Sequence, residues 1–223
     1  MNYKFRFNAI ERYSDELVEG VLLTLQLSLL TMAIGLIIGL IAATAKLSMN
    51  KPLRSVAIVY IEVFRNTPLL VQLFILFFGL PTLGLRMSAN EAAVIGLSLN
   101  VGAYIAEIMR SGMQSVRHSQ IEAAMSLGMK PFQVFRYVTL FQAFKAAYPA
   151  LTSQFVLLIL MTSVVSAIGG TELFHAAAFV ESRTFRSFEV YLVVTLAYFV
   201  LALFFRASFA ALYNIIFTRR ASR

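Results

Sequence analysis

Cysteine is absent from this 223-residue chain, which excludes disulfides, thiolate chemistry and cysteine-ligated metal sites. Only two histidines are present, His118 and His175, and they lie far apart in the sequence, so we expect no metal site. Charged residues make up 13% of the chain, against about 25% in a typical soluble domain. This shortage of charge argues against a soluble globular protein.

Hydrophobic residues, by contrast, make up 59% of the chain and gather in long runs. Such runs are typical of membrane-spanning helices, which satisfy their own backbone polar groups. The formal charge of +8 comes from residues scattered among these runs, so we expect no nucleic-acid partner. The sequence therefore predicts an all-α membrane protein with a single transmembrane domain over residues 1–223 and about five transmembrane helices. The predicted spans lie at about 17–45, 56–80, 89–109, 149–168 and 189–205.

The second predicted span is interrupted by polar residues and a proline. Glu62, Arg65 and Pro68 fall within its apolar run. We therefore interpret residues 55–66 as an interfacial helix and residues 67–80 as the half that enters the membrane more deeply. We expect Glu62 to pair with Arg65 at the cytoplasmic interface.

The distribution of basic residues predicts how the chain is oriented. Six of the nineteen Lys and Arg residues fall on the side of the amino terminus, and thirteen fall on the opposite side. Because Lys and Arg are enriched in cytoplasmic loops, we expect the amino terminus outside and the carboxyl terminus inside. The loop over residues 110–147 then lies in the cytoplasm.

In the first span, Gly35 and Gly39 are four residues apart. Small residues at this spacing either let another helix approach closely or are merely tolerated in a membrane helix.

The cytoplasmic loop contains a segment that reads as a soluble helix. Ser119 and Glu122 have the spacing of a capping box, in which each side chain accepts from the other's backbone amide. Gly128 is a natural helix stop, and Pro131 suits the first turn of a second helix. The sequence predicts a short helix-turn-helix against the cytoplasmic face, with one side free to contact another protein.

The same segment resembles the signature of permease subunits of binding-protein-dependent ABC importers. That signature has Glu-Ala-Ala, then glycine, an aliphatic residue and Leu-Pro at fixed spacings. Here it is matched by Glu122–Ala124, Gly128, Val138 and Leu140, and only the final proline is replaced, by Phe141. Without that proline we predict a helix that continues across Phe141, with the break taken over by Pro149.

Nearly the whole chain is similar to the polar amino acid branch of this family. The segments that carry the similarity are residues 20–30, 62–72, 97–107, 114–115 and 162–169. The resemblance implies the architecture of a type I ABC importer permease (MetI-like) with a cytoplasmic coupling helix, in the bacterial inner membrane. It implies that the helix contacts an ATPase through Glu122, Ala123, Ala124, Leu127, Gly128 and Met129.

The resemblance also implies a set of partners. These are a cytoplasmic ABC ATPase dimer, a second permease subunit, an extracytoplasmic amino acid-binding protein and membrane lipid. The chain has no Walker A motif, so we expect it not to be an enzyme and to bind no cofactor directly. ATP and Mg²⁺ are then used by the ATPase. We expect a heterodimer of permease subunits, and a homodimer stays open.

Polar residues inside the predicted spans are candidates for the substrate pathway, because unsatisfied polar groups in lipid are costly. They are Thr67, Gln72, Asn100, Tyr104, Gln154, Thr162, Ser163 and Ser166. The alternative for each is a hydrogen bond between helices. Relatives carry Lys-Asp or Lys-Asn before the Thr-Ser pair of the fourth span, where this chain has Leu160-Met161, so the partner subunit is expected to supply most substrate contacts.

An ion-coupled secondary transporter or channel is the alternative function. It would need acidic or basic side chains inside the membrane as relays. Glu107 is the only deep acid that the sequence suggests, and we expect it to pair with Arg110. A membrane scaffold without transport is a third possibility, but it leaves the capped cytoplasmic helix unexplained.

Overall fold

The computed structural model describes residues 4–218, with the side chain of Thr218 excepted, and none of these residues lies in a β-strand. The α-helices are α1 (Asn8–Glu11), α2 (Ser14–Lys46), α3 (Lys51–Arg65), α4 (Leu69–Phe74), α5 (Ala89–Gln114), α6 (His118–Ser126), α7 (Pro131–Gln133), α8 (Leu140–Met161), α9 (Leu173–Thr184) and α10 (Ser187–Tyr213). Three π-helical segments are η1 (Ile75–Gly79), η3 (Val134–Thr139) and η5 (Asn214–Thr218), and two 3₁₀ segments are η2 (Leu80–Leu83) and η4 (Thr162–Ile168).

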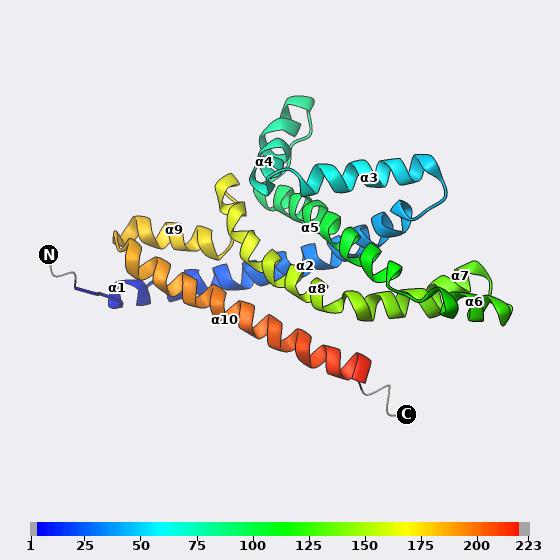
Figure 1. Ribbon diagram of the computed structural model, residues 1–223. Helices are drawn as coiled ribbons and strands as arrows, with labels where there is room; N and C mark the ends of the chain where they lie inside the picture. Colours follow the sequence, from blue (N-terminus) through cyan, green and yellow to red (C-terminus); the bar gives the residue numbers. More distant parts are fainter. Residues whose placement is uncertain (1–3, 219–223) are drawn as a thin grey trace.

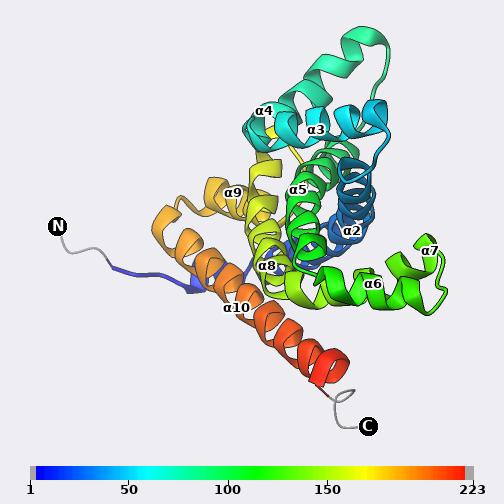
Figure 2. The same cartoon turned by 45° about the vertical axis from the view of Figure 1, so that its right-hand side comes forward.

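Four helical stretches are long and apolar enough to cross a membrane: residues 14–46, 89–114, 131–168 and 187–217. A fifth crossing is possible where α3 and the segment from α4 to η2 form a broken pair bent by 106°. The all-α prediction with about five spans is confirmed. In both views, α1 lies at one end of the bundle, whereas α6 and the end of α10 lie toward the other (Figures 1 and 2).

The bend in the second span follows from the backbone around Pro68. Asn50 caps α3 by accepting a hydrogen bond from the Leu53 amide, and α3 ends at Arg65. Pro68 is extended, with ψ 136°, and α4 restarts directly after it. Since proline lacks an N–H and disfavours the helical conformation in the preceding residue, the chain turns here. The break predicted between the two halves of this span is therefore observed.

The two central helices, α2 and α5, approach each other closely at small residues. A Cβ atom placed on Gly35 would lie 2.3 Å from Val101 Cγ1, and one on Gly39 would lie 2.5 Å from Ile105 Cγ2 and 2.9 Å from the Gly102 carbonyl oxygen. No larger residue fits without separating the helices. Of the two interpretations of the glycine pair, close helix approach is the one observed.

The fourth span is longer than predicted. Instead of starting at Pro149, it starts at Pro131 and runs through η3, α8 and η4 to Ile168 without a break. The helix is continuous across Phe141, as predicted, but Pro149 does not take over the break and lies inside α8. The expected break is wrong because Pro149 removes only the one helical hydrogen bond that its N–H would make, and membrane helices tolerate such a loss.

The connection predicted between the fourth and fifth spans is also more ordered than expected. Residues 173–184 of this polar stretch form α9, which packs against α2 and α10. The side chain of Glu172 caps α9 by accepting from the amides of Phe174 and His175. Leu173, Ala177 and Val180 are buried in a second apolar cluster with residues of α10.

Candidate functional site: the α6 helix and the polar residues of the spans

The helix α6 begins differently from the prediction. Arg117 is the N-cap and its side chain makes no capping bond, so the predicted capping box of Ser119 and Glu122 is wrong. The helix starts two residues earlier than that capping box would place it, at His118, which puts Ser119 inside the first turn. Glu122 then lies one turn after His118, and its Oε1 is 2.9 Å from His118 Nδ1. An i,i+4 pair therefore replaces the expected cap.

The end of α6 follows the prediction closely. Gly128 has φ +81°, the left-handed region that glycine enters without steric cost. Its amide donates to the Met125 carbonyl at 2.9 Å, and the Met129 amide donates to the Ala124 carbonyl at 3.2 Å. This pair of bonds is a Schellman motif, which satisfies carbonyls at the helix end and reverses the chain. Gly128 is thus a geometric requirement for the turn into α7.

The two faces of α6 differ in exposure. Ala124 is 5% exposed, on the side that packs against η3. Leu127 is 84% exposed and Met125 is 48% exposed, and Ala123 is also exposed. Together with α7, the helix projects beyond the rest of the molecule (Figure 2). Of the six residues predicted to contact an ATPase, Glu122, Ala123, Leu127 and Gly128 are exposed, whereas Ala124 is buried and Met129 is half-buried.

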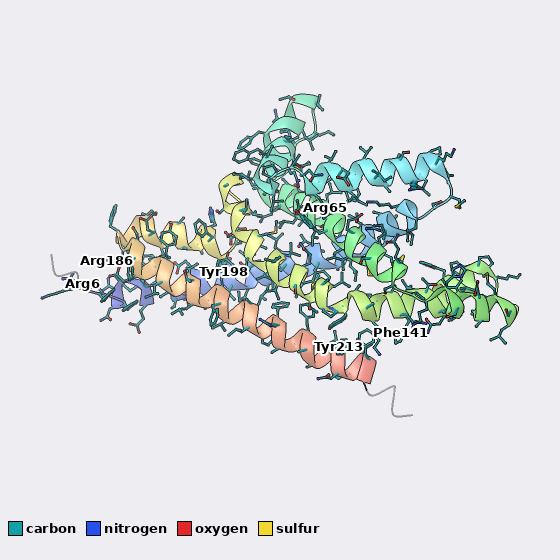
Figure 3. All side chains as sticks on the ribbon, in the orientation of Figure 1. Arg6, Arg65, Phe141, Arg186, Tyr198 and Tyr213 are labelled. Atoms are coloured by element: carbon teal, nitrogen blue, oxygen red, sulfur yellow. The ribbon has the colours of Figure 1, made fainter. Side chains whose placement is uncertain are left out.

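An aromatic cluster connects the start of the fourth span to the end of the chain. Its members are Phe141, Phe144, Tyr148, Tyr213 and Phe217. The ring centroids of Phe141 and Phe217 are 5.6 Å apart, and those of Tyr213 and Phe217 are 5.1 Å apart. Phe141 and Tyr213 accordingly lie near one another in Figure 3. The residue that replaces the signature proline is therefore used to hold η5 against α8.

Four of the predicted pathway residues gather at the bend between α3 and α4. Gln72 Nε2 donates to Thr67 Oγ1 at 2.8 Å and to the carbonyls of Phe64 and Thr67. Gln72 Oε1 accepts from Asn100 Nδ2 at 3.0 Å. Tyr104, one turn after Asn100, donates to the Arg65 carbonyl at 3.4 Å. These side chains satisfy the backbone freed by the bend, which matches the alternative of hydrogen bonds between helices.

The remaining pathway candidates lie on the fourth span. Thr162, Ser163 and Ser166 each donate back to a carbonyl three residues earlier, at 2.7–2.9 Å. Such bonds are the ordinary way for hydroxyl side chains to satisfy themselves in a membrane helix. Gln154 is buried in α8 at 9% exposure. The eight candidates thus fall into two groups, four at the bend and four on α8 and η4, and η4 packs against α4 and α5.

The predicted ion pairs have different outcomes. Glu107 pairs with Arg110 at 2.8 Å, as expected, and also with Lys46 at the end of α2. Glu62 instead accepts from Asn66 Nδ2 at 2.8 Å. The guanidinium of Arg65 lies over the ring of Tyr104, 5.4 Å from its centroid, so the expected Glu62 pair is wrong.

Two acids that the sequence reasoning missed are buried more deeply than Glu107. Glu172 is 1% exposed and Glu189 is fully buried. Glu172 accepts from the Tyr198 hydroxyl at 2.5 Å, and Glu189 accepts from the Arg6 amide at 3.2 Å and lies 3.8 Å from Arg186. Figure 3 shows Arg6 and Arg186 together at one end of the molecule. Because both acids fall at the edges of apolar runs, their positions alone gave no signal of burial.

Burial raises the pKa of Glu172 above its ordinary value of 4.5, despite the opposing effects of its hydrogen bonds and of His175. A carboxyl group with a raised folded-state pKa contributes most to stability below its unfolded pKa, and this contribution is lost as pH rises through the folded value. We therefore expect the melting temperature of the wild type to fall, relative to Glu172→Gln, as pH rises from about 4.5. The measurement is a melting curve in detergent at each pH.

The matched control for this experiment is Glu19→Gln, since Glu19 is an exposed acid on the neighbouring α2. The difference in melting temperature between Glu19→Gln and the wild type should change less with pH than the difference between Glu172→Gln and the wild type. If the difference in melting temperature between the wild type and Glu172→Gln does not change with pH, the expectation is contradicted.

Within residues 4–218 no three His, Asp or Glu side chains gather closely enough to hold a metal ion.

The sequence matches a known protein family and several of its members. The model of the family described as "Binding-protein-dependent transport system inner membrane component" matches residues 35–220. The chain is 36% identical over 203 residues to the probable glutamine ABC transporter permease protein GlnM of Bacillus subtilis (strain 168), covering 91% of this chain and 92% of that protein. It is 38% identical over 204 residues to the probable amino-acid ABC transporter permease protein YckA of the same organism, covering 90% of each.

Solved structures show the same fold. A chain from the "Crystal structure of an amino acid ABC transporter with histidines" is 38% identical, with a TM-score of 0.88, over 96% of this chain and all of that chain. A chain from the inward-facing MetNI methionine ABC transporter superposes with a TM-score of 0.77 at 20% identity, over 90% of this chain and 95% of that one. The predicted MetI-like architecture is confirmed. With a projecting helix, a broken second span and a match over most of its length, this chain belongs to the inner membrane components of binding-protein-dependent transport systems.

Proposed function

We propose that the chain is the permease subunit of an ATP-driven importer for a polar amino acid, and that it forms half of the translocation pathway. The relatives named above are described as permeases for glutamine or for amino acids, which supports this substrate class. Membership of an inner-membrane transport family favours this function over the alternative of an ion-coupled secondary transporter. An extracytoplasmic binding protein would deliver the substrate to the end of the molecule that carries α9.

The exposed face of α6 is the observation that carries the proposal. A helix with Leu127 84% exposed and Met125 48% exposed, fixed at its end by the Gly128 turn, presents apolar side chains to a partner rather than to the protein's own core. Exposed apolar side chains on a projecting element are typical of a protein–protein contact. We assign this contact to a cytoplasmic ATPase, with Glu122, Ala123, Leu127 and Gly128 at the surface and Ala124 and Met129 supporting them.

This contact implies different roles for the permease and the ATPase. The permease itself would catalyse no reaction and hold no cofactor, and ATP and Mg²⁺ would be bound by the ATPase dimer. Because α6 is joined through the Gly128 turn to the helix that runs from Pro131 to Ile168, a displacement of α6 is passed directly to a membrane-crossing helix. Closure of the ATPase dimer would thereby switch the permease between its inward-open and outward-open states.

We further propose that this subunit pairs with a different permease subunit, which supplies most of the substrate contacts. The polar residues of the spans support this, since Gln72, Asn100, Thr162 and Ser163 are engaged in hydrogen bonds within the chain. Leu160 and Met161, just before the Thr-Ser pair, offer no charge for a substrate ammonium group. Transport by a complex of this chain and the ATPase alone would overturn the heterodimer.

The test of the coupling role is co-purification of the ATPase with variants of α6. Gly128→Asp puts a side chain on a residue with φ +81° and should disorder the turn, while Glu122→Arg reverses the charge of the exposed face. We expect the amount of ATPase that co-purifies with each variant to be lower than with the wild type by a factor of about ten or more. A factor of ten corresponds to a loss of about 1.4 kcal/mol in binding free energy. Retention is measured by quantitative blotting of the purified complex.

The control is Glu62→Arg, which makes the same charge change at an exposed glutamate on α3, away from α6. It should retain the ATPase at the wild-type level. If all three variants retain it equally, α6 is not the contact. If the two α6 variants lose the ATPase but transport still depends on ATP, the coupling role is wrong although the contact is real.

A further inference from the structure

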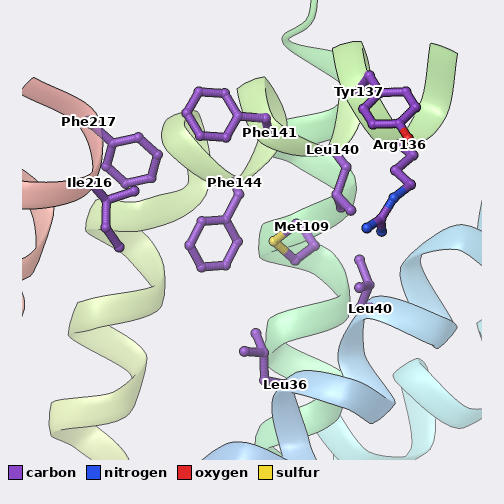
Figure 4. A pocket seen from close by; sticks show the side chains of 10 residues that line it. All are labelled: Leu36, Leu40, Met109, Arg136, Tyr137, Leu140, Phe141, Phe144, Ile216 and Phe217. Atoms are coloured by element: carbon purple, nitrogen blue, oxygen red, sulfur yellow. The ribbon is translucent and has the colours of Figure 1, made fainter. Parts of the chain in front are cut away.

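A cavity of about 410 Å³ lies against η3 and the start of α8 (Figure 4), and η3 packs against α6. Leu36 and Leu40 of α2 line one side and Met109 of α5 lies behind them. Phe144 and Phe217 line the opposite side. The lining is almost wholly apolar, so the cavity suits a hydrocarbon group rather than an amino acid or a nucleotide.

One charged side chain lines this cavity. Arg136 lies in η3, at the edge nearest α7, and its guanidinium group points toward Leu40 in Figure 4. No carboxylate of residues 4–218 lies within ion-pair distance of it, and its only aromatic contact there is with the ring of the adjacent Tyr137, at 5.9 Å. A cation without a counter-ion beside an apolar cavity predicts an occupant with one anionic group and a long apolar group.

The position of the cavity along the bundle fits the depth of one lipid leaflet. Leu40 precedes Lys46, the last residue of α2, by six residues, or roughly 9 Å of helix, and Leu36 lies roughly one turn deeper. The basic residues place this end of α2 at the cytoplasmic surface. A lipid with its phosphate at Arg136 would therefore have its acyl chain directed along α2 toward the membrane centre. Basic pockets between membrane helices on this side are known to bind anionic lipid headgroups.

We propose that this cavity, with Arg136 at its cytoplasmic edge, is a binding site for a monoanionic phospholipid such as phosphatidylglycerol, whose acyl chain packs against Leu36, Leu40 and Phe144. The site is independent of the transported substrate and of the ATPase contact. The sequence after Thr218 carries Arg219, Arg220 and Arg223, so charge argues against that segment as the partner of Arg136. Charge complementarity thus favours a lipid phosphate.

The absence of tryptophan from the chain provides a direct test. Phe141→Trp places a single reporter in the lining of the cavity, and Tyr137→Trp places a second one beside Arg136 in case the first variant does not fold. The full-length variants are reconstituted in vesicles with increasing fractions of dibrominated phosphatidylglycerol or dibrominated phosphatidylcholine, both of which quench nearby tryptophan. We expect half-maximal quenching at a fraction several-fold lower for phosphatidylglycerol. Adding Arg136→Gln should abolish this difference.

Two controls make the outcome decisive. Arg206→Gln removes a charge from an exposed arginine of α10 that does not line the cavity, and it should leave the preference intact. Phe199→Trp places a reporter at an exposed position on α10, where both lipids should quench equally. Equal quenching of the cavity reporters by the two lipids would overturn the headgroup assignment. No quenching there, with normal quenching of Phe199→Trp, would show that protein fills the cavity and would overturn the lipid site.

Discussion

Replacing Gly39 with leucine is expected to destabilise the protein strongly, because it forces the two central helices apart. A side chain at this position would meet Ile105 Cγ2 at 2.5 Å and the Gly102 carbonyl oxygen at 2.9 Å. Ile105 Cγ2 can move with a change of rotamer, but Ile105 Cβ, at 2.6 Å, and the Gly102 carbonyl oxygen are fixed by the α5 backbone, so α2 and α5 must separate. Overpacking of this kind costs about 1–3 kcal/mol, and we expect a value at the upper end. For a chain of this size, that corresponds to a fall in melting temperature of about 10 °C.

The measurement is thermal unfolding in detergent, followed by the loss of the monodisperse peak in size-exclusion chromatography. Gly79→Leu is the matched control, since the nearest atom to a Cβ there is Ile75 Cγ2 at 3.7 Å, an ordinary contact. Its melting temperature should stay close to that of the wild type. Equal melting temperatures for Gly39→Leu and Gly79→Leu would contradict the packing argument. Gly39→Ala should fall between them, although alanine is intrinsically the better helix former.

The second large effect is expected at Glu107. This carboxylate joins Lys46 of α2 to Arg110 of α5, and the side-chain exposures of Glu107 and Lys46 are only 16% and 19%. Glu107→Ala leaves two half-buried cations close together without a counter-charge. Hydrogen bonds to charged groups are worth about 1.5–3 kcal/mol, and we expect a loss of about 3 kcal/mol because two such partners lose their acceptor. Glu107→Gln, which keeps an acceptor, should lose less.

A double-mutant cycle separates this ion pair from a general effect of removing an acid. Lys46→Met combined with Glu107→Ala should destabilise less than the sum of the two single changes, because one of the two unpaired cations is no longer present. Glu62→Ala is the control, since Glu62 is exposed and contacts only Asn66 through its carboxylate. Additive effects at Lys46 and Glu107, or equal melting of Glu107→Ala and Glu62→Ala, would contradict the role of the ion pair.

Sequence patterns predicted best those features that depend on neighbouring residues. Gly128 ends α6 because a left-handed turn there favours glycine, and this could be read from the sequence directly. The bend at Pro68 was predictable for the same reason, since proline restricts its own conformation and that of the residue before it. The family signature supplied the location of α6 but not its exact start. The spacing of Ser119 and Glu122 was compatible with a cap that the helix does not use.

Features that depend on distant contacts were not predictable. Glu172 is buried because Tyr198, on another helix, supplies a hydrogen bond to it. Pro149 continues a helix because the tertiary structure, rather than the local sequence, decides whether a membrane helix can absorb a proline. Likewise, Phe141 finds its partner in Phe217, which is 76 residues later in the chain. Periodicity gives no information about any of these pairings.

The bend at Pro68 has a consequence for how the protein is made. Gln72 satisfies carbonyls freed at the bend, but its own oxygen accepts from Asn100, and Asn100 also donates to the Phe64 carbonyl. During synthesis α3 and α4 leave the ribosome before α5 does. Until Asn100 has entered the bilayer, the bent segment therefore has polar groups that lipid cannot satisfy. The second span would complete its insertion only after the third has arrived, so these two segments enter the membrane as one cooperative unit.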